Sequence, residues 1–475
     1  YRRPYRAIST DRTLIDVVPE APTRNFGVAA DIGTSTVVLR LVDLANGTVI
    51  ASRSAMNAQK PYGADVISRI AHASQGPEHL ARLQGRIVDQ VQEMIGKMLS
   101  EVAGALEEVV LLVAAGNPTM LHLFAGISPE KMATAPFVPV FTDSLVFSAA
   151  EVGLQLHPRA EVRFLPSVAA YVGADIVAGI VATSMDRSEQ PCLLVDLGTN
   201  CEMVLGGRTR MLACATAAGP AFEGAQIECG VGGVPGAIRR VWGNEEPLFE
   251  TIGDLPPVGI CGSGILDTVA LLLSTGLADG TGRMSLSSAN GLGAGFRARM
   301  SESGGDETRT PGSIRFLLTP PHAGLQRAQK GLETALPQEI FFTQKDLREV
   351  QLAKAAVAAG IEVLVERMGI AVGEIAAVYL AGSFGSALSA EAACRIGLLP
   401  ELLRHRIIAV GNSSGRGALL ALRSVADSRR CEEVRHRVEY IELSSDAKFR
   451  DAFIEEMAFP AERPSGAVQT KAEGA

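Results

Sequence analysis

The pattern of apolar and polar positions along the chain predicts strands and helices in an order that repeats. Two short apolar runs, residues 26–30 and 192–195, are typical of buried strands, and a second β-like run follows each after a tight turn. Two long stretches, residues 80–102 and 343–368, carry apolar side chains at helical spacing. Strands followed by helices, twice in one chain, predict an α/β fold made of two similar lobes.

The turns that follow the two apolar runs have similar sequences. The first reads A-D-I-G-T-S-T (residues 30–36) and the second V-D-L-G-T-N (residues 195–200). Glycine allows a tight turn and a close approach to a ligand, and hydroxyl, amide and backbone N–H groups can hold phosphate oxygens. We expect Asp31 and Asp196 to be catalytic carboxylates that hold Mg²⁺ through bound water. The expected nucleotide-binding residues of the turns are Gly33, Thr34, Ser35, Thr36, Gly198, Thr199 and Asn200.

The same pattern divides the chain into units. The strand, turn and strand pattern restarts near residue 190, so we place the boundary between the lobes there. Residues at the start of the chain carry several prolines and no clear period, and a stretch of the second lobe is rich in Gly, Ser and Arg. The expected units are a linker or arm (1–25), a first lobe (26–190), a second lobe (191–460) with a surface insertion near 280–312, and a disordered tail (461–475).

Composition excludes several classes of partner. The chain has 475 residues, of which 47% are hydrophobic and 20% charged, which is enough apolar material for two cores. Its net charge is −8 at pH 7 and it has no basic tract, which argues against binding to nucleic acid or to an anionic membrane surface. No apolar run reaches the length of a membrane span. The seven cysteines are scattered without a C-x-x-C pair, which predicts a cytoplasmic protein.

Five segments of the chain occur in an order that is specific to one superfamily. They are residues 31–36, 168–182, 196–200, 381–385 and 411–424. This order resembles that of acetate and sugar kinases, heat-shock chaperone ATPases and actin (ASKHA proteins). Those proteins have a first phosphate loop, a connecting helix, a second phosphate loop, an adenosine loop and a second connecting helix. The resemblance implies an actin-like, ribonuclease H-like ATPase fold with a nucleotide cleft between two duplicated lobes.

Further candidate site residues lie outside the two turns. Asp175, on the first connecting helix, would orient the water that attacks ATP, and an ordinary helix-end or salt-bridge aspartate is the alternative interpretation. Gly262 and Ser263 precede an expected helix and would offer N–H groups to an anion, or would form a close-packed turn capped by Ser263. The resemblance implies that the adenosine packs on Gly382, Ser383 and Phe384.

A closer resemblance covers nearly all of residues 26–460. The segments that carry it are N-A-Q-K-P-Y-G-A-D-V-I-S-R-I (57–70), G-N-P-T-M (116–120), A-P-F-V-P (135–139), A-A-G-P-A-F-E-G-A (217–225), residues 259–267, T-Q-K-D (343–346) and G-N (411–412). They resemble the reductive activators of corrinoid-dependent enzymes. Members of that family use ATP to drive an uphill one-electron reduction, which returns an inactivated Co(II) corrinoid protein to the methyl-accepting Co(I) state. The resemblance implies ATP and Mg²⁺ as cofactors, a corrinoid protein of a methyltransferase system as partner, and a homodimer.

The chain departs from that family in its cysteines. Family members pass the electron through a plant-type [2Fe–2S] domain at the N-terminus, and the C-x₄₋₅-C-x₂-C spacing of such a cluster is not found in this sequence. The chain starts without Met in a linker-like stretch, so we expect the cluster in an upstream domain absent from this chain. On this hypothesis the chain is an ATP hydrolase coupled to electron transfer, which docks the corrinoid protein but does not deliver the electron.

Two other functions on the same fold stay open at this point. A small-molecule kinase would need a substrate pocket between the lobes and a base near the γ-phosphate. A nucleotide-gated binding protein would bind ATP without turnover and change its affinity for a partner. The sequence identifies neither the methyl donor nor the corrinoid partner.

Overall fold

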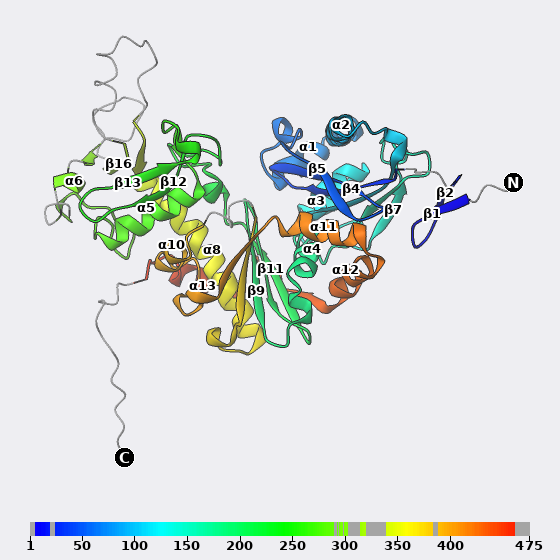
Figure 1. Ribbon diagram of the computed structural model, residues 1–475. Helices are drawn as coiled ribbons and strands as arrows, with labels where there is room; N and C mark the ends of the chain where they lie inside the picture. Colours follow the sequence, from blue (N-terminus) through cyan, green and yellow to red (C-terminus); the bar gives the residue numbers. More distant parts are fainter. Residues whose placement is uncertain are drawn as a thin grey trace, which may run out of the picture.

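Two six-stranded mixed sheets form the centres of the two lobes in the computed structural model (Figure 1). The structure describes residues 5–19, 24–288, 292, 294–297, 299–302, 314–319, 339–382 and 388–460. The first sheet has the order β5-β4-β3-β6-β8-β7, with β3 (Phe26–Ile32), β4 (Thr36–Asp43), β5 (Thr48–Met56), β6 (Val109–Gly116), β7 (Leu145–Ser148) and β8 (Glu161–Phe164). The second has the order β19-β18-β9-β10-β11-β20, with β9 (Cys192–Leu197), β10 (Cys201–Gly206), β11 (Met211–Thr216), β18 (Ala377–Ala381), β19 (Ile407–Gly411) and β20 (Val438–Tyr440).

The two sheets share one pairing scheme. In the first sheet β3 pairs antiparallel with β4 and parallel with β6. In the second sheet β9 takes the same place, antiparallel to β10 and parallel to β18. A third antiparallel strand follows on one side (β5 or β11), and a further parallel strand on the other (β8 or β19). This repeated topology confirms the predicted α/β fold of two duplicated lobes.

A helix of 25 residues covers one face of each sheet: α2 (Pro77–Glu101) packs on β4 and β5, and α8 (Gln344–Met368) on β10 and β11. Thr343 and Asp346 form a capping box at the start of α8, and Gly369, with a φ of 71°, ends it. Among the residues that the structure describes, no helix has both the length and the apolar composition that a membrane span requires. The other helices are α1 (Val66–Ala73), α3 (Pro118–Ala125), α4 (Ala174–Thr183), α5 (Gly262–Ser274), α6 (Ala294–Arg297), α10 (Ala390–Arg395), α11 (Ser413–Arg423), α12 (Val425–Arg437) and α13 (Ala447–Glu455).

Buried side chains of the second sheet alternate between two cores. Leu194 and Val204 join the core of the first lobe, to which α4 and α11 also contribute. Val195 and Met203 belong to the core of the second lobe together with α8. Because neighbouring residues of a strand point to opposite faces, this alternation shows that helices cover the second sheet on both sides.

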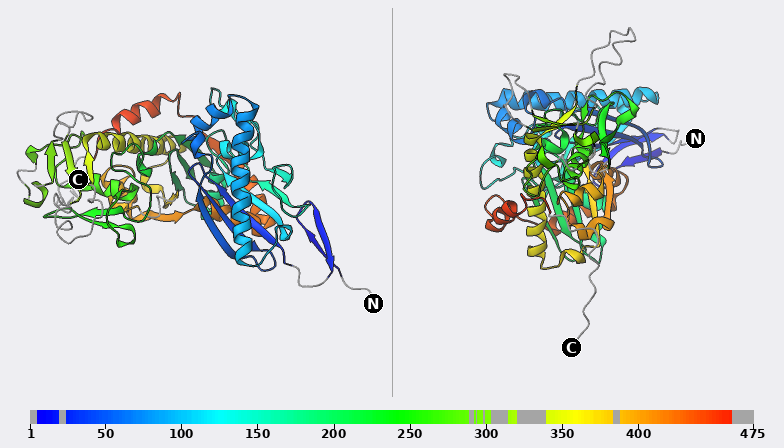
Figure 2. Two further views of the ribbon diagram at one scale, coloured as in Figure 1. Left: turned by 90° about the horizontal axis from the view of Figure 1, so that it is seen from above. Right: turned by 90° about the vertical axis from the view of Figure 1, so that its left-hand side faces the viewer.

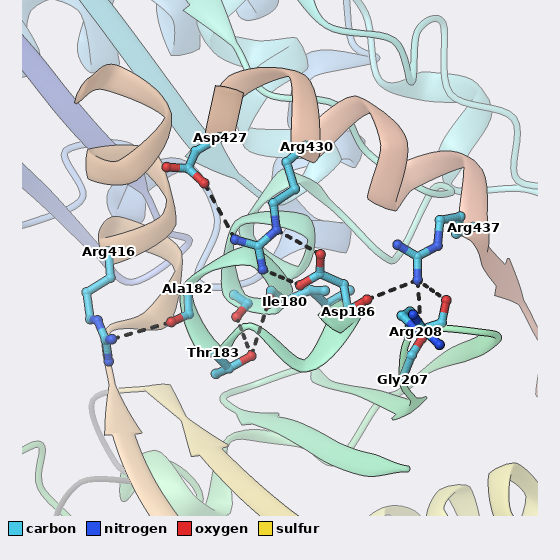
Figure 3. Close-up of polar contacts among 11 residues, drawn as sticks. Ile180, Ala182, Thr183, Asp186, Gly207, Arg208, Arg416, Asp427, Arg430 and Arg437 are labelled. Atoms are coloured by element: carbon cyan, nitrogen blue, oxygen red, sulfur yellow. Dashed lines mark hydrogen bonds and ion pairs between the residues drawn. The ribbon is translucent and has the colours of Figure 1, made fainter. Parts of the chain in front are cut away.

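Two helices cross in the space between the sheets. α11 comes late in the sequence, yet it packs on β3 and β6 of the first sheet and on α4. Glycine permits this close crossing, since a Cβ atom on Gly417 would lie only 2.1 Å from the carbonyl oxygen of Ala178. The next helix, α12, reaches the same region, where Arg430 donates from Nε to Asp186 at 2.7 Å (Figure 3). The C-terminal helices therefore connect the second half of the chain to the first lobe.

The second lobe carries an additional unit beside its sheet, seen at the left of Figure 1. In it α5 packs on the strand β12. The unit contains two small sheets, β13-β12-β14 and β15-β16-β17, with β12 (Ala237–Trp242), β13 (Leu248–Thr251), β14 (Gly259–Ile260), β15 (Met300–Glu302), β16 (Ile314–Leu317) and β17 (Phe341–Thr343). Part of the expected insertion near 280–312, and the expected tail 461–475, lie outside the described residues.

The expected linker or arm contains a β-hairpin, β1 (Tyr5–Ser9) and β2 (Leu14–Pro19), which extends from the first lobe (Figure 2). Its turn is anchored by Asp11, which accepts from the guanidinium of Arg163 at 2.7 Å, and by Thr10, which donates to Glu161 at 3.0 Å. Ile15 is buried, with 1% of its surface exposed. These contacts reach far along the sequence, so the local pattern of the first residues does not reveal the hairpin.

Candidate functional site

The carboxyl ends of β3 and β9 meet at one cavity of about 390 Å³. Each strand leads into a tight turn, in which the N–H of Gly33 donates to the carbonyl of Thr36 (3.1 Å). The N–H of Gly198 donates to the carbonyl of Asn200 (3.1 Å) in the same way. Glycine is required in the first turn, since a Cβ atom on Gly33 would lie 2.6 Å from the Thr36 carbonyl oxygen. The expected site residues that line the cavity are Asp31, Gly33, Thr34, Ser35, Thr36, Asp175, Asp196, Gly198, Thr199, Asn200 and Gly382.

Asp31 is held by the start of α11. Asn412 donates from Nδ2 to one carboxylate oxygen (2.8 Å), and the hydroxyl of Ser414 donates to the other (2.7 Å). Burial raises the pKa of Asp31 above its usual value, although these two hydrogen bonds and the charge of Arg40 act in the opposite direction. Asn412 also accepts the N–H of Gly415 and so caps the helix. The cap residue of α11 and Ser414 in its first turn therefore fix the direction of the Asp31 carboxylate.

Three further carboxyl groups, those of Asp175, Asp196 and Glu202, face the same cavity. Burial raises the pKa of Asp175 to about 7, and the charge of Asp196 adds to this effect. Burial and the charge of Asp31 raise the pKa of Asp196 to about 7. Burial, together with the charges of Asp175 and Asp196, raises the pKa of Glu202 well above its usual value. Burying several carboxylates together is costly in free energy unless a cation neutralises their charge. Carboxylate oxygens are ligands that suit Mg²⁺, so the acids of the cavity fit that ion.

Glu223 connects the two turns. Its Oε1 accepts the hydroxyl of Thr199 (2.8 Å), and its Oε2 accepts the hydroxyl of Ser35 (3.2 Å). Ser35 belongs to the first lobe, whereas Thr199 and Glu223 belong to the second. Glu223 ends a short helical turn, η5 (Pro220–Glu223), which packs on α5 and α8. The carboxylate is thus fixed from the second lobe and reaches across the cleft to the first.

The structure does not bring Gly262 and Ser263 into the cavity. The hydroxyl of Ser263 donates instead to the carbonyl of Arg239 on β12 (2.8 Å), and α5 begins without a side-chain cap. A Cβ atom on Gly264 would lie 2.3 Å from the carbonyl oxygen of Ile238, so this start of α5 is packed tightly on β12. The close-packed turn is therefore the better interpretation, without the expected cap.

Ser383 and Phe384, the expected adenosine-packing partners of Gly382, lie outside the described residues.

Sequence reasoning missed Asn412, Ser414 and Arg40 as parts of the site. An asparagine before a helix is ordinarily interpreted as a cap, and Asn412 does cap α11. Because that role already explains the residue, the sequence gives no sign of its second bond, to Asp31. Arg40 lies on β4 and lines the cavity together with Thr36 and Val38. The period of two along that strand was a usable signal, because alternate strand residues share a face.

Known families match almost the whole described chain. The family described as "RACo middle region" matches residues 26–188. The family described as "C-terminal domain of RACo the ASKHA domain" matches residues 190–298 and 324–469. The chain belongs to the RACo family. The two matched regions meet in the short segment between η4 (Met185–Arg187) and β9. The match confirms both the family resemblance and the ASKHA fold expected from the sequence.

Individual relatives agree with the RACo assignment. The corrinoid activation enzyme RamQ of Eubacterium limosum is 33% identical over 457 residues, which are 96% of this chain and 74% of RamQ. The [Co(II) methylated amine-specific corrinoid protein] reductase of Methanosarcina barkeri is 25% identical over an alignment of 473 positions, which covers 91% of this chain and 77% of that protein. A solved structure described as a reductive activator for corrinoid, iron-sulfur protein superposes with a TM-score of 0.80 at 34% identity, covering 94% of this chain and 68% of that one.

Proposed function

We propose that this chain is the ATP-hydrolysing and partner-docking part of a reductive activator, which returns a Co(II) corrinoid protein of a methyltransferase system to the Co(I) state. Family membership supports the reaction, since relatives are named a corrinoid activation enzyme and a Co(II) corrinoid protein reductase. The observation that carries the ATP-dependent part is the meeting of two phosphate-type turns, one from each lobe, at a single acid-lined cavity. A [2Fe–2S] cluster in a separate domain of the activator would supply the electron.

The cavity residues divide the work of ATP hydrolysis. The hydroxyls and backbone N–H groups of the two turns bind the phosphates. Asp31 and Asp196, whose carboxyl groups line the cavity, would hold Mg²⁺ through bound water. The ion, when bound, neutralises charge on the phosphates. Asp175 orients the attacking water, since its carboxyl group lines the same cavity as the two turns.

Nucleotide can drive the reduction only through a difference between two states of the protein. The added electron converts Co(II) to Co(I), and ATP lowers the cost of that step only if the states before and after bind nucleotide with different affinity. The two turns belong to different lobes, so a bound triphosphate contacts both lobes at once. Hydrolysis removes part of that contact and so favours a change in lobe closure. This change is transmitted to the docked corrinoid protein.

Phosphate release from ATP tests the proposal most directly. The purified chain should hydrolyse ATP slowly with Mg²⁺, and a Co(II) corrinoid protein from the same genome should raise the rate. Asp196→Asn should abolish the activity while leaving the fold intact, and Glu93→Gln, which changes an exposed carboxylate on α2, should leave it unchanged. ATPase activity that is indifferent to every such corrinoid protein would contradict the proposal. A phosphorylated metabolite as product would identify a kinase instead, and light scattering would test the proposed homodimer.

A further inference from the structure

The segment from Asn57 to Arg69 lies behind the first phosphate turn and holds its backbone. The carbonyl of Gly33 accepts from Nδ2 of Asn57 (2.8 Å), and the carbonyl of Ser35 accepts from the backbone N–H of the same asparagine (2.9 Å). Between them, the carbonyl of Thr34 accepts from Nη2 of Arg69 (2.6 Å). Three successive carbonyl groups of the turn are thus bonded by one segment of the chain.

These bonds set the direction of the N–H groups in the turn. In a trans peptide the C=O group and the N–H group of the following residue point in opposite directions. The N–H groups of Thr34, Ser35 and Thr36 therefore point away from Asn57 and Arg69. The residues of the turn line the cavity and their two partners do not, so these N–H groups face the cavity. Within the described part of the chain, the N–H groups of Thr34 and Ser35 have no acceptor.

Arg69 adds a positive charge directly behind the turn. Its side chain is fully buried, with 0% exposed. Burial lowers the pKa of its guanidinium to about 10, and the charge of Asp65 offsets this only in part, so the group stays protonated at neutral pH. Among the residues that the structure describes, no carboxylate is paired with this group; a buried cation without such a partner is costly, and an anion across the turn would offset that cost. The other hydrogen-bond partners of the guanidinium are neutral: the carbonyl of Gly63 (2.9 Å), the amide oxygen of Gln59 (3.3 Å) and the sulfur of Met120 (3.0 Å).

We infer that Asn57 and Arg69 are positioning residues of the nucleotide site: they orient the first turn so that its N–H groups bind the phosphates, and Arg69 adds its charge to that surface. The inference rests on the proposed function, which supplies the nucleotide. It gives a physical role to the segment at 57–70, for which the sequence alone provided only a resemblance to a family.

Calorimetry with two probes separates phosphate binding from general damage. The probes are AMP-PNP with Mg²⁺, which carries three phosphate-type groups, and adenosine, which carries none. Arg69→Met removes a charge-assisted bond to the turn, so AMP-PNP binding should weaken by about tenfold to a hundredfold. Adenosine binding should stay unchanged, and Arg69→Lys, which keeps the charge, should restore part of the AMP-PNP affinity.

A second variant tests Asn57 with little change in shape. Asn57→Asp keeps the oxygen that accepts the N–H of Gln59 (2.9 Å) but removes the donor to Gly33. It should also weaken AMP-PNP and leave adenosine unaffected. Arg299→Met is the matched control, because Arg299 is likewise buried at 7% exposure and donates to a main-chain carbonyl, that of Leu318 (3.0 Å), away from the cavity.

Each outcome decides between the inference and the function on which it rests. If the unmodified chain does not bind AMP-PNP, the proposed function fails and the inference fails with it. If the chain binds AMP-PNP, but Arg69→Met weakens both probes equally or no more than Arg299→Met does, the inference alone is overturned. Selective loss of AMP-PNP affinity in both the Arg69 and Asn57 variants supports it.

Discussion

The hydroxyl of Ser35 and the carboxylate of Glu223 are joined across the cleft between the lobes, with 3.2 Å between Oγ and Oε2. The second carboxylate oxygen accepts the hydroxyl of Thr199 in the other turn (2.8 Å). A hydroxyl group has a single hydrogen to donate, so neither hydroxyl can serve the carboxylate and a phosphate oxygen at the same time. A phosphate that binds these hydroxyls must therefore displace Glu223.

Glu223→Gln should tighten the binding of Mg²⁺-ATP. The change removes a negative charge next to the proposed phosphate positions, and a gain of about 1.4 kcal/mol, or about tenfold in affinity, is the expected scale for one such repulsion in a partly buried site. Titration calorimetry on the variant and on the unmodified chain measures it, with Glu93→Gln as the control for losing an exposed carboxylate. Weaker binding in Glu223→Gln would show that the carboxylate assists the nucleotide and does not compete with it.

The buried acids should make stability depend on pH in a definite direction. The pKa of Asp196 rises from 3.8 to about 7 on folding, mainly through burial. Between about pH 4 and about pH 7 the folded state then holds a proton that the unfolded state has lost, so the free energy of unfolding falls as pH rises through this window and stays lower above it. Asp196→Asn removes this dependence and should therefore be more stable than the unmodified chain at pH 8, with little difference at pH 4.

Denaturant unfolding at several pH values measures that effect, and Asp451→Asn, at an exposed position, controls for the substitution itself. An advantage of Asp196→Asn that is equal at low and high pH would contradict the assignment. The same ionisation predicts that the Mg²⁺-ATP affinity of the unmodified chain increases from pH 6 to pH 8, since the carboxylates would hold the proposed Mg²⁺ only when charged.

The crossing of α4 and α11 should tolerate no side chain at Gly417. A Cβ atom there would lie 2.1 Å from the carbonyl oxygen of Ala178, so Gly417→Ala must push the two helices apart. We expect a loss of about 1–3 kcal/mol in the free energy of unfolding, the usual cost of overpacking. Gly85→Ala and Gly96→Ala on α2 are matched controls, because a Cβ atom meets nothing within 4 Å at either position. These two changes should stabilise the helix by about 0.5–1 kcal/mol. Equal effects at all three positions would contradict the packing argument.

The parts of the site that the sequence predicted are those that consecutive residues determine. The two turns bring Asp31 and Asp196 with their hydroxyl neighbours to the cavity because strand, glycine and turn follow one another along the chain. The bond from Asn412 to Asp31 joins residues 381 positions apart, and no local pattern shows it. The same limit explains the hairpin at residues 5–19, whose anchor Asp11 meets Arg163 over 152 positions.

Gly262 and Ser263 illustrate a different limit. A glycine-rich turn before a helix has the same local appearance whether its N–H groups face an anion or a packed neighbour. Only the position of β12 distinguishes the anion site from the packed turn. The carbonyl of Arg239 on this strand accepts the hydroxyl of Ser263. The sequence therefore predicted the helix that follows and left two roles open for its first residues.

The ion pair between Arg430 and Asp186 should be the most sensitive polar contact of α12. Asp186 is buried, with 3% exposed, and lies just before the chain crosses into the second lobe, while Arg437 donates to its main-chain carbonyl at 3.1 Å (Figure 3). Arg430→Met leaves the carboxylate buried without its partner, so the free energy of unfolding should fall by about 3–5 kcal/mol. Replacing the exposed pair of Lys97 and Glu93 on α2 should cost about 0.5 kcal/mol or less.

The double variant Arg430→Met with Asp186→Leu separates the cost of an unpaired charge from the value of the pair. Because the desolvation of both charges offsets most of their attraction, the double variant should recover much of the stability that the single change loses. Denaturant unfolding of the two single variants and the double variant gives the coupling energy directly. If the double variant is as unstable as the sum of the single ones, the two side chains stabilise the fold through separate contacts. α12 is then held to the first lobe by its packing and by its other polar contacts, such as the bond from Arg435 Nε to the carbonyl of Ser167 (3.1 Å).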